Sequence, residues 1–268
     1  MPDALSPADL EALRRAVRYL ERLSFAARLT SMVGKPVDLI GRALPKGASQ
    51  TITAATTKGL QAAVRIALTT IGNEPQASSM LLHKALAVAS GATGGAFGLA
   101  SLPVELPVST IIMFRSILDI ARSEGENLRD PEAALSCIEV FGLGGRTESD
   151  DTADTGYFVV RGVLAHSVTE AARFVAERGF IEEGAPVLVR LIAQISARFG
   201  AVITQKAAAQ AIPVIGALGG AAVNYAFVEH FQTVARGHFT VRRLERMYGE
   251  DIVRSTYERL SKEDRSTA

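Results

Sequence analysis

The segment AAAQAIPVIGALGGAAVNYAFVEHFQTVARGHFTVRRLERMY, residues Ala207–Tyr248, organises the rest of the chain. Its first half is rich in Ala and Gly, it restarts at Pro213, and its second half is rich in Arg. Apolar residues recur there at steps of three and four, which predicts one helix from Pro213 to Tyr248 with a single buried stripe. The stripe consists of Val223, Phe227, Phe231, Val234, Val241, Leu244 and Tyr248. Arg242, Arg243 and Arg246 fall mostly off this stripe and are interpreted as a solvated face, suited to anionic head groups.

Two tracts of small residues suggest close helix packing. The sequence GATGGA begins at Gly91, and GALGGA begins at Gly216. A surface almost without side chains lets helix backbones approach closely, as in a glycine zipper. We therefore predict two small-residue helices packed together at the centre, while a chance repeat in an Ala/Gly-rich chain is the alternative. The helix-packing glycines are Gly91, Gly94, Gly95, Gly98, Gly216, Gly219 and Gly220.

The composition favours helices and excludes several kinds of site. Hydrophobic residues make up 48% of the 268 residues, aromatic residues only 6%, and Trp is absent. A core of Ala, Leu, Val and Ile without period-two alternation predicts an all-α, compact multi-helix bundle. The net charge of +1 argues against a nucleic-acid partner. The single cysteine, Cys137, excludes an intramolecular disulfide and a cysteine-rich zinc site, so neither a metal nor a cofactor is expected.

The apolar segments leave the relation to the membrane open. The N-terminus reads as a charged amphipathic helix without the apolar core of a signal peptide, so the expected location is cytoplasmic. Two uncharged runs, Ala85–Val104 and Ala207–Val228, each have about the 20 residues that a membrane helix needs. Gly and Ala replace the Leu and Ile that drive insertion. The two runs are therefore compatible with buried core helices, with a peripheral membrane role and with stable insertion.

Caps, glycines and prolines divide the chain into helices. Ser6 or Asp9 is expected to cap a helix that continues to about Ser31, and Asp130 to cap one that begins at Pro131. The LPVELP segment, Leu102–Pro107, is expected to break the chain between two helices. The further predicted helices are Pro36–Leu44, Ser49–Ile71, Gln76–Ala100, Val108–Glu124, Pro131–Phe141, Tyr157–Glu177, Glu182–Gln210 and Asp251–Leu260.

The domain organisation follows from these elements. Residues 1–30 are predicted to form an N-terminal amphipathic helix, and residues 31–262 one helical domain. The acidic loop at 142–156 is the only subdomain joint, and residues 263–268 are expected to form a disordered tail.

Several long blocks of sequence resemble a known family. They are GATGGAFGLASLP at Gly91–Pro103, LPVELPVSTIIMFRSILDIARSEGENLRDPEAALSCIEVFGLGG at Leu102–Gly145, GYFVVRGVLA at Gly156–Ala165, and the block Lys206–Gly249. In this order they resemble the EcsC family of bacterial proteins, which is named for a member encoded beside an ABC transporter. The resemblance covers about residues 30 to 260 and leaves out the first 30. It implies a helical fold and a link to the cell envelope, and it supplies no catalytic residues.

A few polar residues in apolar surroundings are candidates for a binding site. Glu105 lies between two prolines, Asp119 is four residues after Arg115, and Asn224 and His230 lie in the apolar part of the Ala207–Tyr248 segment. A carboxylate in an apolar core needs a partner, so pairing within Arg115–Asp119 or with an arginine of another helix is expected. The alternative is that Glu105, Arg115, Asp119, Asn224 and His230 form one polar site between helices for a head group or a proton.

The histidines show no metal or catalytic spacing. His230 and His238 are eight residues apart, unlike the i, i+4 pairs of metal-binding helices. His238, Arg242 and Glu245 share a helix face, which predicts an ion-pair cluster.

The expected function is therefore non-enzymatic. The sequence favours a helical protein that associates peripherally with membrane lipid, or with a membrane protein, at the cytoplasmic face. The alternative is a hydrolase of lipid or peptide that uses His230 with a carboxylate such as Glu105.

Overall fold

The described part of the chain is helical throughout. The computed structural model describes residues 4–21, 25–26, 29–30, 47–71, 102–145, 156–178, 185–210 and 216–266. Eight helices and no strand occur in these ranges, which confirms the all-α prediction. Their bounds are α1 Pro7–Glu21, α4 Ala48–Ile71, α6 Leu102–Ser123, α7 Pro131–Leu143, α9 Gly156–Arg178, α10 Pro186–Gln210, α11 Gly216–Tyr248 and α12 Glu250–Ser266.

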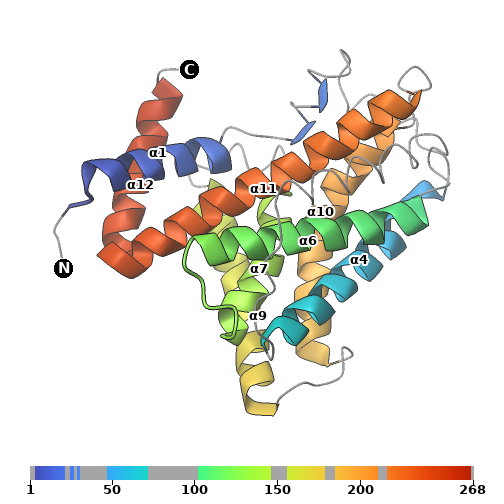
Figure 1. The fold of residues 1–268 in the computed structure, drawn as a ribbon, viewed down its shortest axis with the longest axis horizontal. Coiled ribbons are helices and arrows are strands. Elements are labelled where there is room, and N and C mark those ends of the chain that lie inside the picture. The colour runs from blue at the N-terminus through green and yellow to red at the C-terminus, as the bar shows by residue number, and fades with distance from the viewer. Residues whose placement is uncertain are drawn as a thin grey trace.

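The 33-residue helix α11 runs across the molecule and organises the other helices (Figure 1). Helices α1 and α12 pack against it and against each other, and α6, α7 and α10 also contact it. Helix α4 packs on α6, α7 and α10, while α9 covers α7 and α10. The arrangement is a compact bundle in which α7 and α10 lie between α11 and the outer helices.

Large side chains fill the centre of this bundle. All seven predicted stripe residues of α11 are buried, so its amphipathic pattern is confirmed. Phe227 and Phe231 of α11 meet Phe199 of α10 and Phe141 of α7, with ring centroids 4.7 to 6.1 Å apart. Such offset and edge contacts add to the burial of the rings.

The predicted pairing of the two glycine tracts remains untested. The tract Gly91–Gly98 lies outside the described residues. Gly216, Gly219 and Gly220 form the first turns of α11, but their burial is not described. The close approach of two small-residue helices therefore stays a prediction.

Local sequence signals place several helix ends. The Ser6 Oγ accepts a hydrogen bond from the Asp9 amide at 3.1 Å, and the Asp130 Oδ1 accepts one from the Glu132 amide at 2.9 Å. Both are N-caps that satisfy first-turn amides, as expected. Gly249 separates α11 from α12 with φ +92°, a conformation that side chains disfavour.

Two predicted helix boundaries were wrong. Helix α6 begins at Leu102 rather than Val108 and includes Pro103 and Pro107. First-turn amides have no acceptor within the helix, so Pro103 loses nothing there, and Pro107 removes only one early hydrogen bond. Helix α12 continues to Ser266, through part of the expected tail. The i, i+4 ion pair of Arg259 with Glu263 spans the predicted end and supports this extension.

The N-terminal helix is an integral part of the bundle. Helix α1 packs along α11 and α12. The Tyr248 hydroxyl donates a hydrogen bond to Asp9 Oδ2 at 2.7 Å, which ties the start of α1 to the end of α11. The predicted apolar face of α1 is buried at Leu13, Val17 and Leu20.

One glycine allows the end of α7 to meet α10. A Cβ added at Gly145 would overlap the carbonyl oxygen of Arg198. Because backbone cannot yield as a side chain can, we expect Gly145→Ala to lower the free energy of unfolding by about 1–3 kcal/mol. Urea denaturation measures this loss. Gly162→Ala is the control, since its Cβ meets no atom within 4 Å in the interior of α9, and it should gain about 0.5–1 kcal/mol. If Gly145→Ala and Gly162→Ala had the same free energy of unfolding, the close approach of α7 to α10 at Gly145 would be contradicted.

Candidate functional site

Glu105 finds its partner on another helix, but the partner is a lysine. Lys206 Nζ of α10 lies 2.8 Å from Glu105 Oε1 of α6, and the two side chains are 0% and 3% exposed. The ammonium also lies 4.7 Å from the centre of the Phe227 ring. Burial lowers the pKa of Lys206, although the attraction of Glu105 opposes this shift. Sequence patterns do not indicate this pairing, because Lys206 and Glu105 are 101 positions apart.

The other predicted polar residues make separate contacts. Arg115 is exposed, while Asp119 accepts a hydrogen bond from Arg122 Nη1 at 3.0 Å. Asn224 and His230 are buried, and His230 Nε2 donates to the Gly144 carbonyl at 2.9 Å. Asp119 and His230 thus have separate partners, and the grouping of the five residues around one ligand stays a prediction.

The contacts of the described histidines bear on the hydrolase alternative. His230 bonds to a backbone carbonyl, and His238 Nδ1 shares a hydrogen bond with the Tyr157 hydroxyl at 2.9 Å. His166 lies 3.4 Å from Glu170, but on the exposed surface of α9. No group of three His, Cys, Asp or Glu that could hold a metal occurs among the described residues. The described ranges thus place no histidine beside a carboxylate in a cleft.

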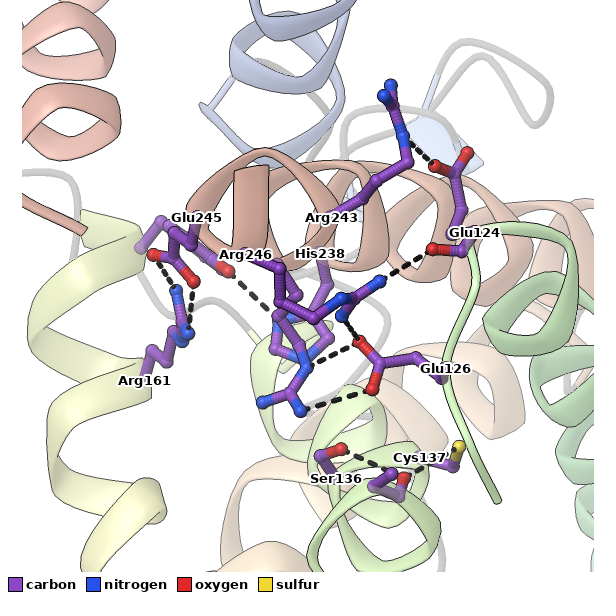
Figure 2. Close-up of polar contacts among 12 residues, drawn as sticks. Glu124, Glu126, Ser136, Cys137, Arg161, His238, Arg243, Glu245 and Arg246 are labelled. Carbon is purple, nitrogen blue, oxygen red and sulfur yellow. Dashed lines mark hydrogen bonds and ion pairs between the residues drawn. The ribbon is translucent and has the colours of Figure 1, made fainter. Parts of the chain in front are cut away.

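The arginines of α11 pair with acidic side chains instead of only facing solvent, although Arg246 is exposed. Arg242 binds both carboxylate oxygens of Glu126 at 2.9 and 3.2 Å, and Arg246 binds Glu126 and the Glu124 carbonyl (Figure 2). Arg243 binds Glu124 Oε2 at 2.8 Å and Asp9 Oδ1 at 3.2 Å. These ion pairs lower the pKa of Glu126 despite its burial. The arginines therefore fasten the α6–α7 turn and α1 to α11.

The predicted cluster of His238, Arg242 and Glu245 was also wrong. Glu245 accepts two hydrogen bonds from Arg161 of α9, at 2.6 and 2.7 Å, as Figure 2 shows. Burial lowers the pKa of His238 well below its usual value, so this side chain is neutral. The members of the cluster pair across helices because their helix face is covered by α7 and α9 instead of water.

A groove between α4 and α10 has a volume of about 500 Å³. Its size lies in the range of sites for small molecules and acyl chains. Apolar side chains and the hydroxyl groups of Ser and Thr line it together, and Ile52 and Ile192 are its buried apolar residues. The walls include Thr53, Thr57, Val189, Ala193, Ala197 and Gly200.

The two helices that form the groove carry no acidic residue. Their 24 and 25 residues contain Lys58, Arg65, Arg190, Arg198 and Lys206, but neither Asp nor Glu. Lys58, Arg65 and Arg190 are exposed. Arg190 also lies 3.3 Å from Glu170 of α9. The two helices therefore contribute only basic charges, and none of the basic residues lines the groove itself.

Helix α10 contains the one candidate membrane span in the described residues. The span Pro186–Ala209 has a mean hydropathy of 1.5, and 39% of its apolar window is buried. The two uncharged runs predicted from the sequence as candidate membrane segments are different parts of the chain. Ala85–Val104 lies almost wholly outside the described residues, and Ala207–Val228 is divided between α10 and α11. Helix α10 is not an uncharged run, because it contains Arg190, Arg198 and Lys206.

Comparison with known proteins identifies the family. A family model described as the EcsC protein family matches residues 8–244. The chain belongs to this family. The match includes α1, which the resemblance had left out, in keeping with its packing on α11. No curated protein and no solved structure matches the chain. Membership of the EcsC family brings no residue roles, so its function must be inferred from the geometry.

Proposed function

We propose that this member of the EcsC family is a non-catalytic helical protein that associates peripherally with an anionic membrane surface. The contact is made by the face of α4 and α10. One observation supports this most: α10 is apolar enough for a membrane span, yet only 39% of its apolar window is buried. Apolar surface of this kind, left open beside a groove, is typical of a site for lipid or a hydrophobic partner.

The charge of this face favours lipid as the partner. Each Lys or Arg near an anionic bilayer contributes about 1 kcal/mol. Lys58 and Arg65 are exposed and Arg190 lies beside Glu170, so charge alone gives only weak attraction. Burial of Val189 and its neighbours would add about 25 cal/mol for each Å² removed from water. The electrostatic attraction and the burial of apolar surface together give reversible binding that weakens as the salt concentration increases.

The same helix argues for lying on the membrane rather than crossing it. A basic residue near the centre of a membrane helix costs about 2.5–3.5 kcal/mol on insertion scales. Helix α10 carries Arg190, Arg198 and Lys206, and the buried pair of Lys206 with Glu105 holds it to α6. Because the cytoplasmic leaflet is the anionic one, we place the protein at the cytoplasmic face.

Flotation with vesicles tests this proposal. The protein should rise with vesicles that contain phosphatidylglycerol and stay at the bottom with pure phosphatidylcholine. The double variant Val189→Asp/Ala193→Asp places two carboxylates on the groove wall, and it should lose most of the binding. Met247→Asp is the matched control, because Met247 is also half-exposed but lies in the last turn of α11. Failure of the wild-type protein to float with any of the lipid mixtures would contradict the proposal.

A further inference from the structure

A buried carboxylate without a hydrogen-bond partner lies beside a second cavity. Glu139 of α7 is 2% exposed, and its Oε1 has no partner among the described residues. It lines a cavity of about 330 Å³ between α7, α9, α11 and α12. A carboxylate oxygen that loses water without gaining a donor costs free energy, so such a group calls for a ligand or a function.

The cations nearest to Glu139 are already engaged. Arg161 of α9 is held by both oxygens of Glu245, and Arg242 of α11 by both oxygens of Glu126. The lining also includes Glu132, and Glu250 and Asp251 at the start of α12. With Arg254, the lining has three guanidinium groups against five carboxylates. The cavity is therefore negative overall when Glu139 is ionised.

The protonation of Glu139 depends on what enters the cavity. Burial raises the pKa of its carboxyl to about 7, and Glu132 and Glu245 add to this shift, while Arg161 and Arg242 oppose it. In the empty cavity the carboxyl is thus partly protonated at neutral pH. A cation beside it would favour the ionised form and release a proton.

We propose that this cavity binds a small organic cation that carries a primary ammonium group. The ammonium donates hydrogen bonds to the Glu139 carboxylate, and Glu132, Glu250 and Asp251 compensate the remaining charge. An ammonium has three donors and no acceptor, so it matches a carboxylate that lacks donors. The volume lies within the range of small-molecule sites. The negative lining disfavours an anion, and the described residues offer no group of three metal ligands.

This inference is independent of the proposed membrane contact, because the cavity shares no lining residue with the groove between α4 and α10. A variant that loses one site should keep the other.

Isothermal titration calorimetry with putrescine and spermidine tests the site. We expect binding at low ionic strength, and at least a tenfold loss of affinity in Glu139→Gln, which keeps the shape but removes the charge. Glu170→Gln on the outer surface of α9 is the control and should bind as the wild type does. The dianion glutarate, of similar length, should not bind.

Proton release separates this site from weak attraction to surface carboxylates. Titrations at pH 7 in two buffers of different ionisation enthalpy should show release of a fraction of a proton from the wild type, and none from Glu139→Gln. Absence of binding by the wild type at millimolar amine would overturn the inference. So would equal binding, or equal proton release, by the wild type and Glu139→Gln.

Discussion

Lys206→Met is expected to lower the free energy of unfolding by about 3–5 kcal/mol, the loss typical of breaking a buried ion pair from one side. The change removes the ammonium that lies 2.8 Å from Glu105 and leaves the carboxylate in a site where the side chain is 3% exposed. The pair also joins α6 to α10, and Phe227 of α11 packs on the ammonium. Urea denaturation followed by circular dichroism measures the loss.

A double variant separates the cost of the lone charge from the value of the pair. Glu105→Leu combined with Lys206→Met replaces both charges by apolar groups of similar volume. Such replacements are often neutral or stabilising, so the double variant should recover most of the stability that the single change loses. If the double variant is as unstable as Lys206→Met alone, uncompensated charge is not the cause of the loss.

Glu139→Gln is expected to have the opposite effect and to stabilise the protein at pH 8. The folded state raises the pKa of Glu139 from 4.5 to about 7, so between these values the folded chain binds a proton that the unfolded chain has released. Stability therefore falls as pH rises through this window. A shift of this size corresponds to about 3 kcal/mol at pH 8. Glutamine does not titrate and avoids the loss.

The pH dependence provides the check on this second prediction. The advantage of Glu139→Gln in urea denaturation should shrink as pH falls from 7 and vanish near 4.5. Glu132→Gln is the control, because Glu132 is exposed on the same helix and surface changes usually alter stability by less than about 0.5 kcal/mol. An advantage of Glu139→Gln that is the same at pH 4 and pH 8 would rule out the titration of this carboxyl.

The parts of the fold that depend on neighbouring residues could be predicted from the sequence. The caps at Ser6 and Asp130 and the apolar stripe of α11 are local patterns, and the structure confirms all three. The start of α6 was misplaced by six residues, because two prolines close together suggest a break although both are tolerated near a helix N-terminus.

The ion pairs could not be predicted because they join distant parts of the chain. Lys206 and Glu105 are 101 residues apart, and Arg242 and Glu126 are 116 apart. Helical periodicity shows which side of a helix is polar, but not which helix faces it. The sequence therefore predicts a solvated arginine face on α11, although α1 and the α6–α7 turn supply the acidic partners.

Two sequence signals would have indicated the buried charges. Glu139 lies in SCIEVFG and Lys206 in TQKAAAQ, so each is the single charged residue of a short apolar or uncharged stretch within a helix. Charged residues are rarely buried without a partner or a function. Helix α10 could also have been predicted to be apolar, because its basic residues are few and widely spaced.

The membrane contact can be measured directly at one position, because the chain has no Trp. Val189→Trp places the only indole on the wall of the groove, where Val189 is half-exposed, and Met247→Trp places it at the end of α11. On addition of vesicles that contain phosphatidylglycerol, we expect the Val189→Trp emission to shift to shorter wavelength and the Met247→Trp emission to stay unchanged. Unchanged emission from Val189→Trp, at vesicle concentrations at which the protein binds and floats, would contradict contact of the α4–α10 face with the membrane.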